Sequence, residues 1–193
     1  GPDGWHLESA GQGVLQAPFD ALLVALPSQP AADLLEGMTP LVDLARSVTW
    51  DPCWAVTMAL AQETGAGFDG AFINDDPILG WAALDSVKPG RGRTAGIAER
   101  WVLHARPQWS QRYADIEPQD ACRWLIRSFS ARLRISLNPV AAHGRLWRHA
   151  TPVNPLPQRC LWDRERRVGM AGDWCGGPRI EGAFLSGLAL AEA

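Results

Sequence analysis

The stretch VGMAGDWCGGPRIEGAFLSG, residues 168–187, decides the fold. Its first residues are apolar and predict a buried strand, with Asp173 at the carboxyl end of that strand. A glycine-rich loop follows, and a helix is predicted from about Glu181 to the end of the sequence. In open α/β sheets, ligands bind at the carboxyl ends of strands, where the chain continues into a helix. The stretch therefore predicts a ligand site.

The chemistry of this loop favours an anionic or electron-rich ligand atom. Free N–H groups and the positive end of the helix dipole meet at the start of the predicted helix. Gly176, Gly177 and Gly182 allow a ligand to approach the backbone closely. The Asp173 carboxylate can accept hydrogen bonds from sugar-type hydroxyls. An ordinary strand-to-helix connection, in which the glycines serve only the turn, is the alternative interpretation.

The same stretch resembles the C-terminal FAD-binding motif of flavin amine oxidases and renalases. The residues in common are Gly172, Asp173, Gly176, Gly177, Arg179, Glu181, Gly182, Ala183, Ser186 and Gly187. The resemblance implies that Asp173 holds the ribityl part of FAD, and that backbone N–H groups of 181–183 face the N1/O2 edge of the flavin. The cofactor-binding residues implied in this way are Gly172, Asp173, Trp174, Arg179, Ile180, Glu181, Gly182 and Ala183. The catalytic side chains stay unknown, and no metal site is expected.

Other segments resemble the same family in order and position. Residues 20–27 resemble the strand that returns to the nucleotide domain, and 101–109 and 146–150 resemble strands of the renalase-like substrate domain. The family's N-terminal strand and G-x-G-x-x-G turn have no counterpart. The string at Gly11 has Gln16 in the place of the last glycine and no buried strand before it. The string at Gly90 follows Pro89 and polar residues and leads into a strand instead of a helix. We therefore expect this chain alone to bind FAD weakly or not at all.

The remaining pattern predicts a mixed helix and sheet architecture. The run 19–27 is continuously apolar, which is typical of a strand buried on both faces. Short strands separated by Gly, Pro and Asp turns predict an antiparallel sheet. These strands are expected at 53–61, 71–74, 78–84, 100–105, 145–150 and 160–163. A long amphipathic helix is expected to begin at Glu117-Pro118 and to close at Asn138-Pro139.

We therefore expect an α+β chain with an interrupted domain. Residues 1–37 would form a partial FAD-binding domain containing a hairpin, the buried strand and a helix. Residues 38–166 would form a substrate-binding domain built on the antiparallel sheet with helices. Residues 167–193 would supply the closing strand and helix of the incomplete, Rossmann-like FAD-binding domain.

Composition narrows the classes of function. The net charge of −3 over 193 residues argues against nucleic acid as a partner, and no apolar run reaches the roughly 20 residues of a membrane span. Four cysteines without a CxxC pair and four scattered histidines argue against zinc. Free thiols suit a reducing, cytoplasmic location. Ten tryptophans predict a large aromatic core or a flat-walled pocket.

Some polar residues outside the motif have a structural and a functional interpretation. His104 fits a strand histidine packed among aromatic rings better than a catalytic base. Trp147 and Arg148 are interpreted as structural, and turn chemistry accounts for Asp75 and Asp76.

The resemblance implies an oxidase that uses a small-molecule substrate. Hydride would pass from a reduced nicotinamide to flavin N5, with O2 reduced to H2O2. Oxidation of an amine by the same flavin is one alternative, and a non-catalytic binding module is another. An incomplete domain exposes apolar strand edges around 22–26, so we also expect association, with a homodimer as one form.

Overall fold

The computed structural model describes residues 4–11, 13–15, 18–92 and 94–193. Its contacts divide the chain into two units. The first unit joins Gly1–Trp50 to Thr151–Ala193, and the second is the continuous stretch Asp51–Ala150. The expected boundaries near 37/38 and 166/167 differ from this division. The reason is that the second helix of the chain packs on the first helix, and the strand at 161–163 pairs with the strand at 168–170, so both belong to the first unit.

The first unit is built around a parallel strand pair. In the described residues its main sheet has the order β3-β10-β9, from β3 (Leu22–Val24), β10 (Val168–Met170) and β9 (Leu161–Asp163). β10 runs parallel to β3 and antiparallel to β9. A short hairpin of β1 (Glu8–Ser9) and β2 (Gly13–Val14) precedes the sheet.

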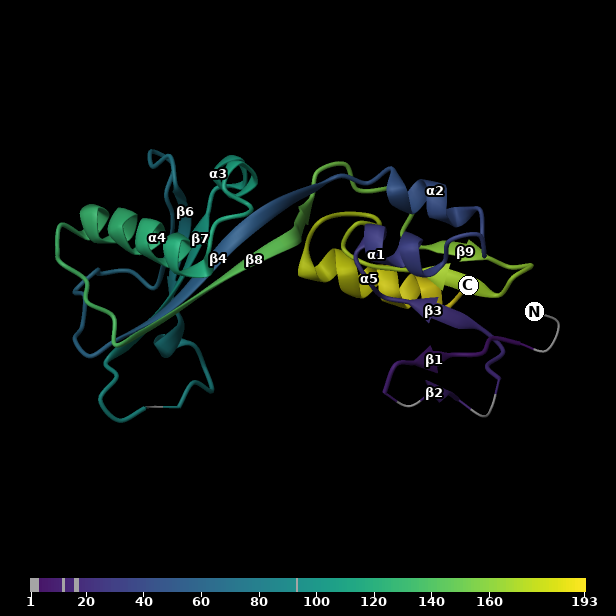
Figure 1. Cartoon of the computed structure of the whole chain (residues 1–193), viewed down its shortest axis with the longest axis horizontal. Coiled ribbons are helices and arrows are strands. Elements are labelled where there is room, and N and C mark those ends of the chain that lie inside the picture. The colour runs from purple at the N-terminus through teal and green to yellow at the C-terminus, as the bar shows by residue number, and fades with distance from the viewer. Residues whose placement is uncertain (1–3, 12, 16–17, 93) are drawn as a thin grey trace. The chain divides into compact units, whose positions relative to one another are not determined.

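Three helices complete the first unit in the part of the chain that is described. They are α1 (Ser28–Leu34), α2 (Leu41–Arg46) and α5 (Ile180–Ala191). Apolar residues of α1 and α2 join those of β3, β9 and β10 in one core, in which Leu35, Val168, Met170 and Trp174 are fully buried. Figure 1 shows the C-terminal helix α5, in yellow, running beside the strands of this unit.

The run 19–27 was expected to form a strand buried on both faces, and β3 is not buried in this way. The strand is only three residues long, and the side chain of Leu23 is 53% exposed. Within the described residues β3 lies at the edge of its sheet, beside β10 alone. Its apolar run is therefore covered only in part.

The second unit is an antiparallel sheet covered by a helix, as the turn-rich pattern predicts. The sheet order in the described residues is β5-β6-β7-β4-β8. The strands are β4 (Trp50–Leu60), β5 (Gly70–Phe72), β6 (Leu79–Leu84), β7 (Glu99–Ala105) and β8 (Ala141–Pro152). A short 3-10 helix, η1 (Asp85–Val87), follows β6, and α3 (Pro107–Arg112) follows β7.

Helix α4 (Pro118–Leu133) covers one face of this sheet and packs against β6 and β7 (Figure 1). Its buried residues meet Trp101 and Leu103 of β7, and the ring of Phe129 lies 4.9 Å from that of Trp101. Alternation along β7 sends one set of side chains into this core and the other set to the opposite face. Arg100, Val102 and His104, which belong to the second set, are only half-buried.

The helices of the described residues all lack the length and apolar character that crossing a bilayer requires.

Candidate functional site

The carboxyl ends of the parallel strands β3 and β10 form a hollow together with helix α5. Its volume is about 300 Å³. The lining residues are Ala25, Leu26, Pro27, Ala171, Gly172, Asp173, Ala183 and Gly187. Three of them follow β3, three follow β10, and two lie on α5. This is the position at which open sheets with parallel strands hold ligands.

Two hydrogen bonds fix the walls of this hollow. The Gly172 N–H donates to the Oγ of Ser186, which is fully buried, at 3.0 Å, and so ties the end of β10 to α5. The indole N–H of Trp174 donates to the carbonyl oxygen of Leu26 at 3.0 Å, and so ties the loop after β10 to the end of β3. The backbone that lines the hollow is therefore held from both sides.

Asp173 is the charged group of the hollow. In the described part of the chain its carboxylate has no side-chain partner, and the one hydrogen bond that lowers its pKa comes from its own backbone N–H. Burial is the larger effect and raises the pKa of Asp173 above its ordinary value. A half-buried carboxylate without a partner is suited to accept hydrogen bonds from a ligand.

The beginning of α5 adds hydrogen-bond donors near this site. The first helical hydrogen bond runs from the Ala183 N–H to the Arg179 carbonyl at 2.9 Å, so the preceding amides of 180–182 have no partner within the helix. The Gly177 carbonyl packs against Gly182, where even a methyl group would collide with it. Gly182 is thus required by close packing of the loop on the helix.

The hollow brings together only part of the predicted cofactor set. Gly172, Asp173 and Ala183 line it. Trp174 is fully buried in the core, so its ring has no surface to offer a ligand in this structure. Arg179, Ile180 and Glu181 are exposed and lie outside the lining of the hollow.

Sequence reasoning missed the other wall. Ala25, Leu26 and Pro27 carry no chemical signal of their own, and they join the site only because β3 pairs in parallel with β10. Gly187 belongs to the resembling motif but was not expected to line the site. A Cβ added at Gly187 would meet no protein atom within 4 Å. The absent side chain leaves room for the hollow.

In the second unit, His104 takes the packing role expected from the sequence. Its ring lies 4.8 Å from that of Trp81 on the neighbouring strand. Burial, and secondly the charge of Lys88, lower the pKa of His104. Both effects favour the neutral imidazole.

The turn at Asp75-Asp76 is structural, as expected. Asp76 accepts hydrogen bonds from the N–H groups of Ile78 and Leu79, both at 2.8 Å, and from the Ser128 hydroxyl at 2.6 Å. Asp75 pairs with Arg132. These contacts hold the loop between β5 and β6 and account for both carboxylates in structural terms.

Comparison with known proteins places this architecture among oxidoreductase structures, while no protein-family model matches the chain. An Exiguobacterium sp. 255-15 protein assigned as a protoporphyrinogen oxidase superposes with a TM-score of 0.65 at 14% identity. An oxidoreductase from Methanosarcina mazei gives 0.65 at 10%, and cyclohexylamine oxidase from Brevibacterium oxydans IH-35A gives 0.61 at 15%.

These matches cover nearly all of this chain but less than half of each matched structure. They span 97%, 97% and 98% of this chain but 43%, 48% and 46% of the three structures, in the same order. The chain therefore has the fold of slightly less than half of each of these proteins. At such low identity the likeness concerns the fold alone.

Proposed function

We propose that this chain is the C-terminal part of an FAD-dependent oxidase and that the hollow of the first unit holds the ribityl region of the cofactor. One observation carries the proposal. At the carboxyl ends of the parallel strands β3 and β10, Asp173 presents a carboxylate that has no side-chain partner among the described residues. The resemblance of 172–187 to a flavin motif and the shared fold with oxidase structures support the same conclusion.

The residues present fit a polyol chain beside a flat ring system. Asp173 can accept hydrogen bonds from hydroxyl groups, and the free amides of 180–182 can donate to an electron-rich ring edge. Gly187 leaves space where a side chain would fill the hollow. A volume of about 300 Å³ suits a fragment of a dinucleotide rather than the whole molecule. The ADP part of FAD would need binding elements outside this hollow, so the affinity of this chain alone for FAD should be low.

The protein's own contribution is orientation and electrostatics. FAD, when bound, would supply the redox chemistry: a hydride, which is two electrons and one proton, would leave the substrate, and O2 would take up the two electrons, that proton and one more from water to give hydrogen peroxide. Asp173 would orient the cofactor through its hydroxyl groups. The positive end of α5 would favour negative charge at the ring edge that it faces.

Two substrate classes follow from this proposal. The renalase-like resemblance favours a reduced nicotinamide, which gives up a hydride without acid–base assistance. An amine is the second candidate, because one structure that shares this fold is a cyclohexylamine oxidase.

The proposal is tested by titrating FAD into the 193-residue chain and into any longer natural form of the protein, with visible absorbance as the readout. Asp173→Ala should weaken binding about tenfold or more, because a carboxylate–hydroxyl contact contributes about 1.5–3 kcal/mol. Gly187→Leu should occupy part of the hollow, because Gly187 lines it and a Cβ added there would lie in open space. Glu192→Ala, an exposed carboxylate that follows the same helix, is the matched control and should bind as the wild type does.

Two results would contradict the proposal. One is a longer form that fails to bind flavin, which would favour a non-catalytic binding module. The other is equal affinity of the wild type and Gly187→Leu, which would place the cofactor elsewhere. If flavin binds as proposed, peroxide formation with reduced nicotinamides and with alkyl amines separates the two substrate classes.

A further inference from the structure

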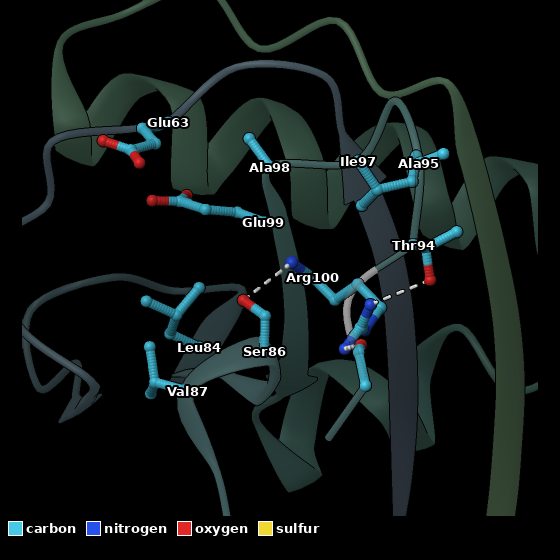
Figure 2. Close-up of a pocket in the computed structure, with 11 residues that line it drawn as sticks. Glu63, Leu84, Ser86, Val87, Thr94, Ala95, Ile97, Ala98, Glu99 and Arg100 are labelled. Atoms are coloured by element: carbon cyan, nitrogen blue, oxygen red, sulfur yellow. Dashed lines mark hydrogen bonds between the residues drawn. The ribbon is translucent and has the colours of Figure 1, made fainter.

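The second unit contains a pocket of about 640 Å³ at the beginning of β7, shown in Figure 2. Its described lining residues are Glu63, Leu84, Ser86, Val87, Gly92, Thr94, Ala95, Ile97, Ala98, Glu99 and Arg100. The sequence pattern gave no indication of it. All of its elements belong to one unit, so its shape is defined within that unit.

Glu99 is the buried charge of this pocket. Only 9% of the residue is exposed. Its Oε2 atom accepts hydrogen bonds from the Trp101 indole N–H at 2.7 Å and from the Thr64 N–H at 3.1 Å. Neither donor carries a charge. Oε1 receives no hydrogen bond, and no cation pairs with the carboxylate, within the residues that the structure describes.

The described cations near the pocket are engaged by other groups. Lys88 and Arg91 both pair with Asp85, at 3.1 and 3.2 Å. The Arg100 guanidinium donates to the Gly92 carbonyl at 2.9 Å and to the Thr94 hydroxyl at 3.3 Å. Figure 2 shows it on the Thr94 side, away from the Glu99 carboxylate. A buried carboxylate without a cation is unfavourable unless a partner from outside compensates it.

The rest of the lining indicates the shape of such a partner. Figure 2 draws the carboxylates of Glu63 and Glu99 on the same side of the pocket. Leu84, Val87 and Ile97 supply apolar surface to the same pocket. Two carboxylates beside an apolar wall suit a cationic head with a short hydrocarbon body.

We propose that this pocket binds a small organic cation, a protonated alkylamine or its guanidinium counterpart, with Glu99 as the anchoring carboxylate. The Trp101 and Thr64 donors hold Glu99 in place, so Oε1 is presented to the ligand at no further cost in side-chain freedom. Glu63 contributes a second, more exposed negative charge. The site lies in the second unit, and its binding does not depend on flavin.

The test uses n-butylammonium chloride as the probe and the indole ¹H–¹⁵N resonance of Trp101 as the readout, on the 193-residue chain. Because this N–H is bonded to Glu99, a cation at the carboxylate should shift its resonance. We expect a dissociation constant on the order of 1 mM, as for a well-placed fragment of this size. n-Butanol, which has the same chain without the charge, should leave the resonance unchanged at the same concentrations.

Matched variants locate the site. Glu99→Gln keeps an acceptor for Trp101 but removes the charge, and it should weaken binding about tenfold or more. Glu63→Gln should weaken it about threefold, because an exposed charge is screened. Asp115→Asn, an exposed carboxylate of the same unit outside the pocket, should bind as the wild type does. Val87→Lys places an ammonium group in the pocket from an exposed position, and it should compete with the probe even if Glu99→Gln does not fold.

The proposal is overturned if butanol and butylammonium act alike, or if no shift occurs up to about 50 mM probe. Equal probe affinity in the wild type, Glu99→Gln and Val87→Lys would also overturn it, since binding would then lie elsewhere.

Discussion

Asp173 is placed where its charge is costly for the folded chain. Burial raises the pKa of its carboxyl group, and the described residues supply no side-chain donor that would offset this. Carboxylates in such a setting are typical of functional sites, because a neutral residue of the same size would favour the folded state more. The same carboxylate is the group proposed to bind the cofactor hydroxyls.

Asp173→Asn should therefore stabilise the chain at neutral pH. A raised carboxyl pKa means that the folded state binds protons that the unfolded state has released, above the ordinary value of 3.8. The wild type then loses stability as the pH rises through the window between 3.8 and the folded pKa. The variant, which does not titrate, should be more stable than the wild type at pH 7 and equal to it below about pH 3. Urea unfolding at both pH values measures the difference, and a wild type that is the more stable one at pH 7 contradicts the expectation.

The sequence could predict which residues lie at the end of the strand, but not the direction in which each side chain points. Asp173 and Gly172 were placed at the end of a strand by the pattern alone, and the structure puts them in the hollow. Trp174, the next residue, belongs to the set that the resemblance implies for the cofactor, and the structure buries its side chain in the core. A loop that is neither helix nor strand has no side-chain period from which its directions can be read.

At the scale of elements, the packing of α5 on β10 places two glycines in opposite settings, Gly169 on β10 and Gly187 on α5. Gly169 of β10 lies under α5, and a Cβ there would collide with the Leu190 side chain and lie 2.8 Å from the Leu161 carbonyl. Gly187, on α5 itself, has nothing within 4 Å of that position. Gly169→Ala should destabilise the chain by about 1–3 kcal/mol through overpacking. Gly187→Ala should stabilise it by about 0.5–1 kcal/mol through helix propensity.

Thermal and urea unfolding of both variants measure these changes. If the two substitutions alter the free energy of unfolding by the same amount and sign, the packing of α5 on β10 described above is incorrect.

Most elements could be predicted from periodicity, and the errors have local causes. The pattern gave α4 a later end, at Asn138, whereas the helix stops at Leu133 because Arg134 takes a left-handed backbone with φ of 56°. The strand expected at 100–105 is confirmed as β7, whereas the longer segment 101–109 that resembles a strand of the family also includes Pro107, which begins α3. Proline at the first position of a helix was the available signal. The pairing of β3 with β10 could not be read locally, because it joins distant segments.

At the scale of the whole molecule, uncovered apolar surface predicts self-association. Leu23 on β3 is 53% exposed, and on α5 Ile180 and Phe184 are 93% and 70% exposed. Apolar strand edges and helix stripes of this kind associate in water. The 193-residue chain should form dimers or larger species at high concentration, and the double variant Leu23→Lys/Phe184→Lys should shift it toward monomer.

Light scattering across a concentration series measures this association. Phe72→Lys, which replaces an aromatic residue of the second unit that is even more exposed than Phe184, is the control and should leave the association unchanged. A wild-type chain that stays monomeric at high concentration, or a control as effective as the double variant, contradicts the prediction.

The division of the first unit between the two ends of the chain has a consequence for biosynthesis. Leu26 and Trp174, which are hydrogen-bonded partners, stand 148 positions apart. At about 5–20 residues per second, a ribosome needs roughly 7–30 s to make the second partner after the first. During that interval the continuous second unit can fold. The apolar residues of β3 and α1 remain exposed, because their partners in the C-terminal segment have not yet been made. Nascent chains halted before residue 168 should therefore be the forms of this protein that chaperones hold most tightly.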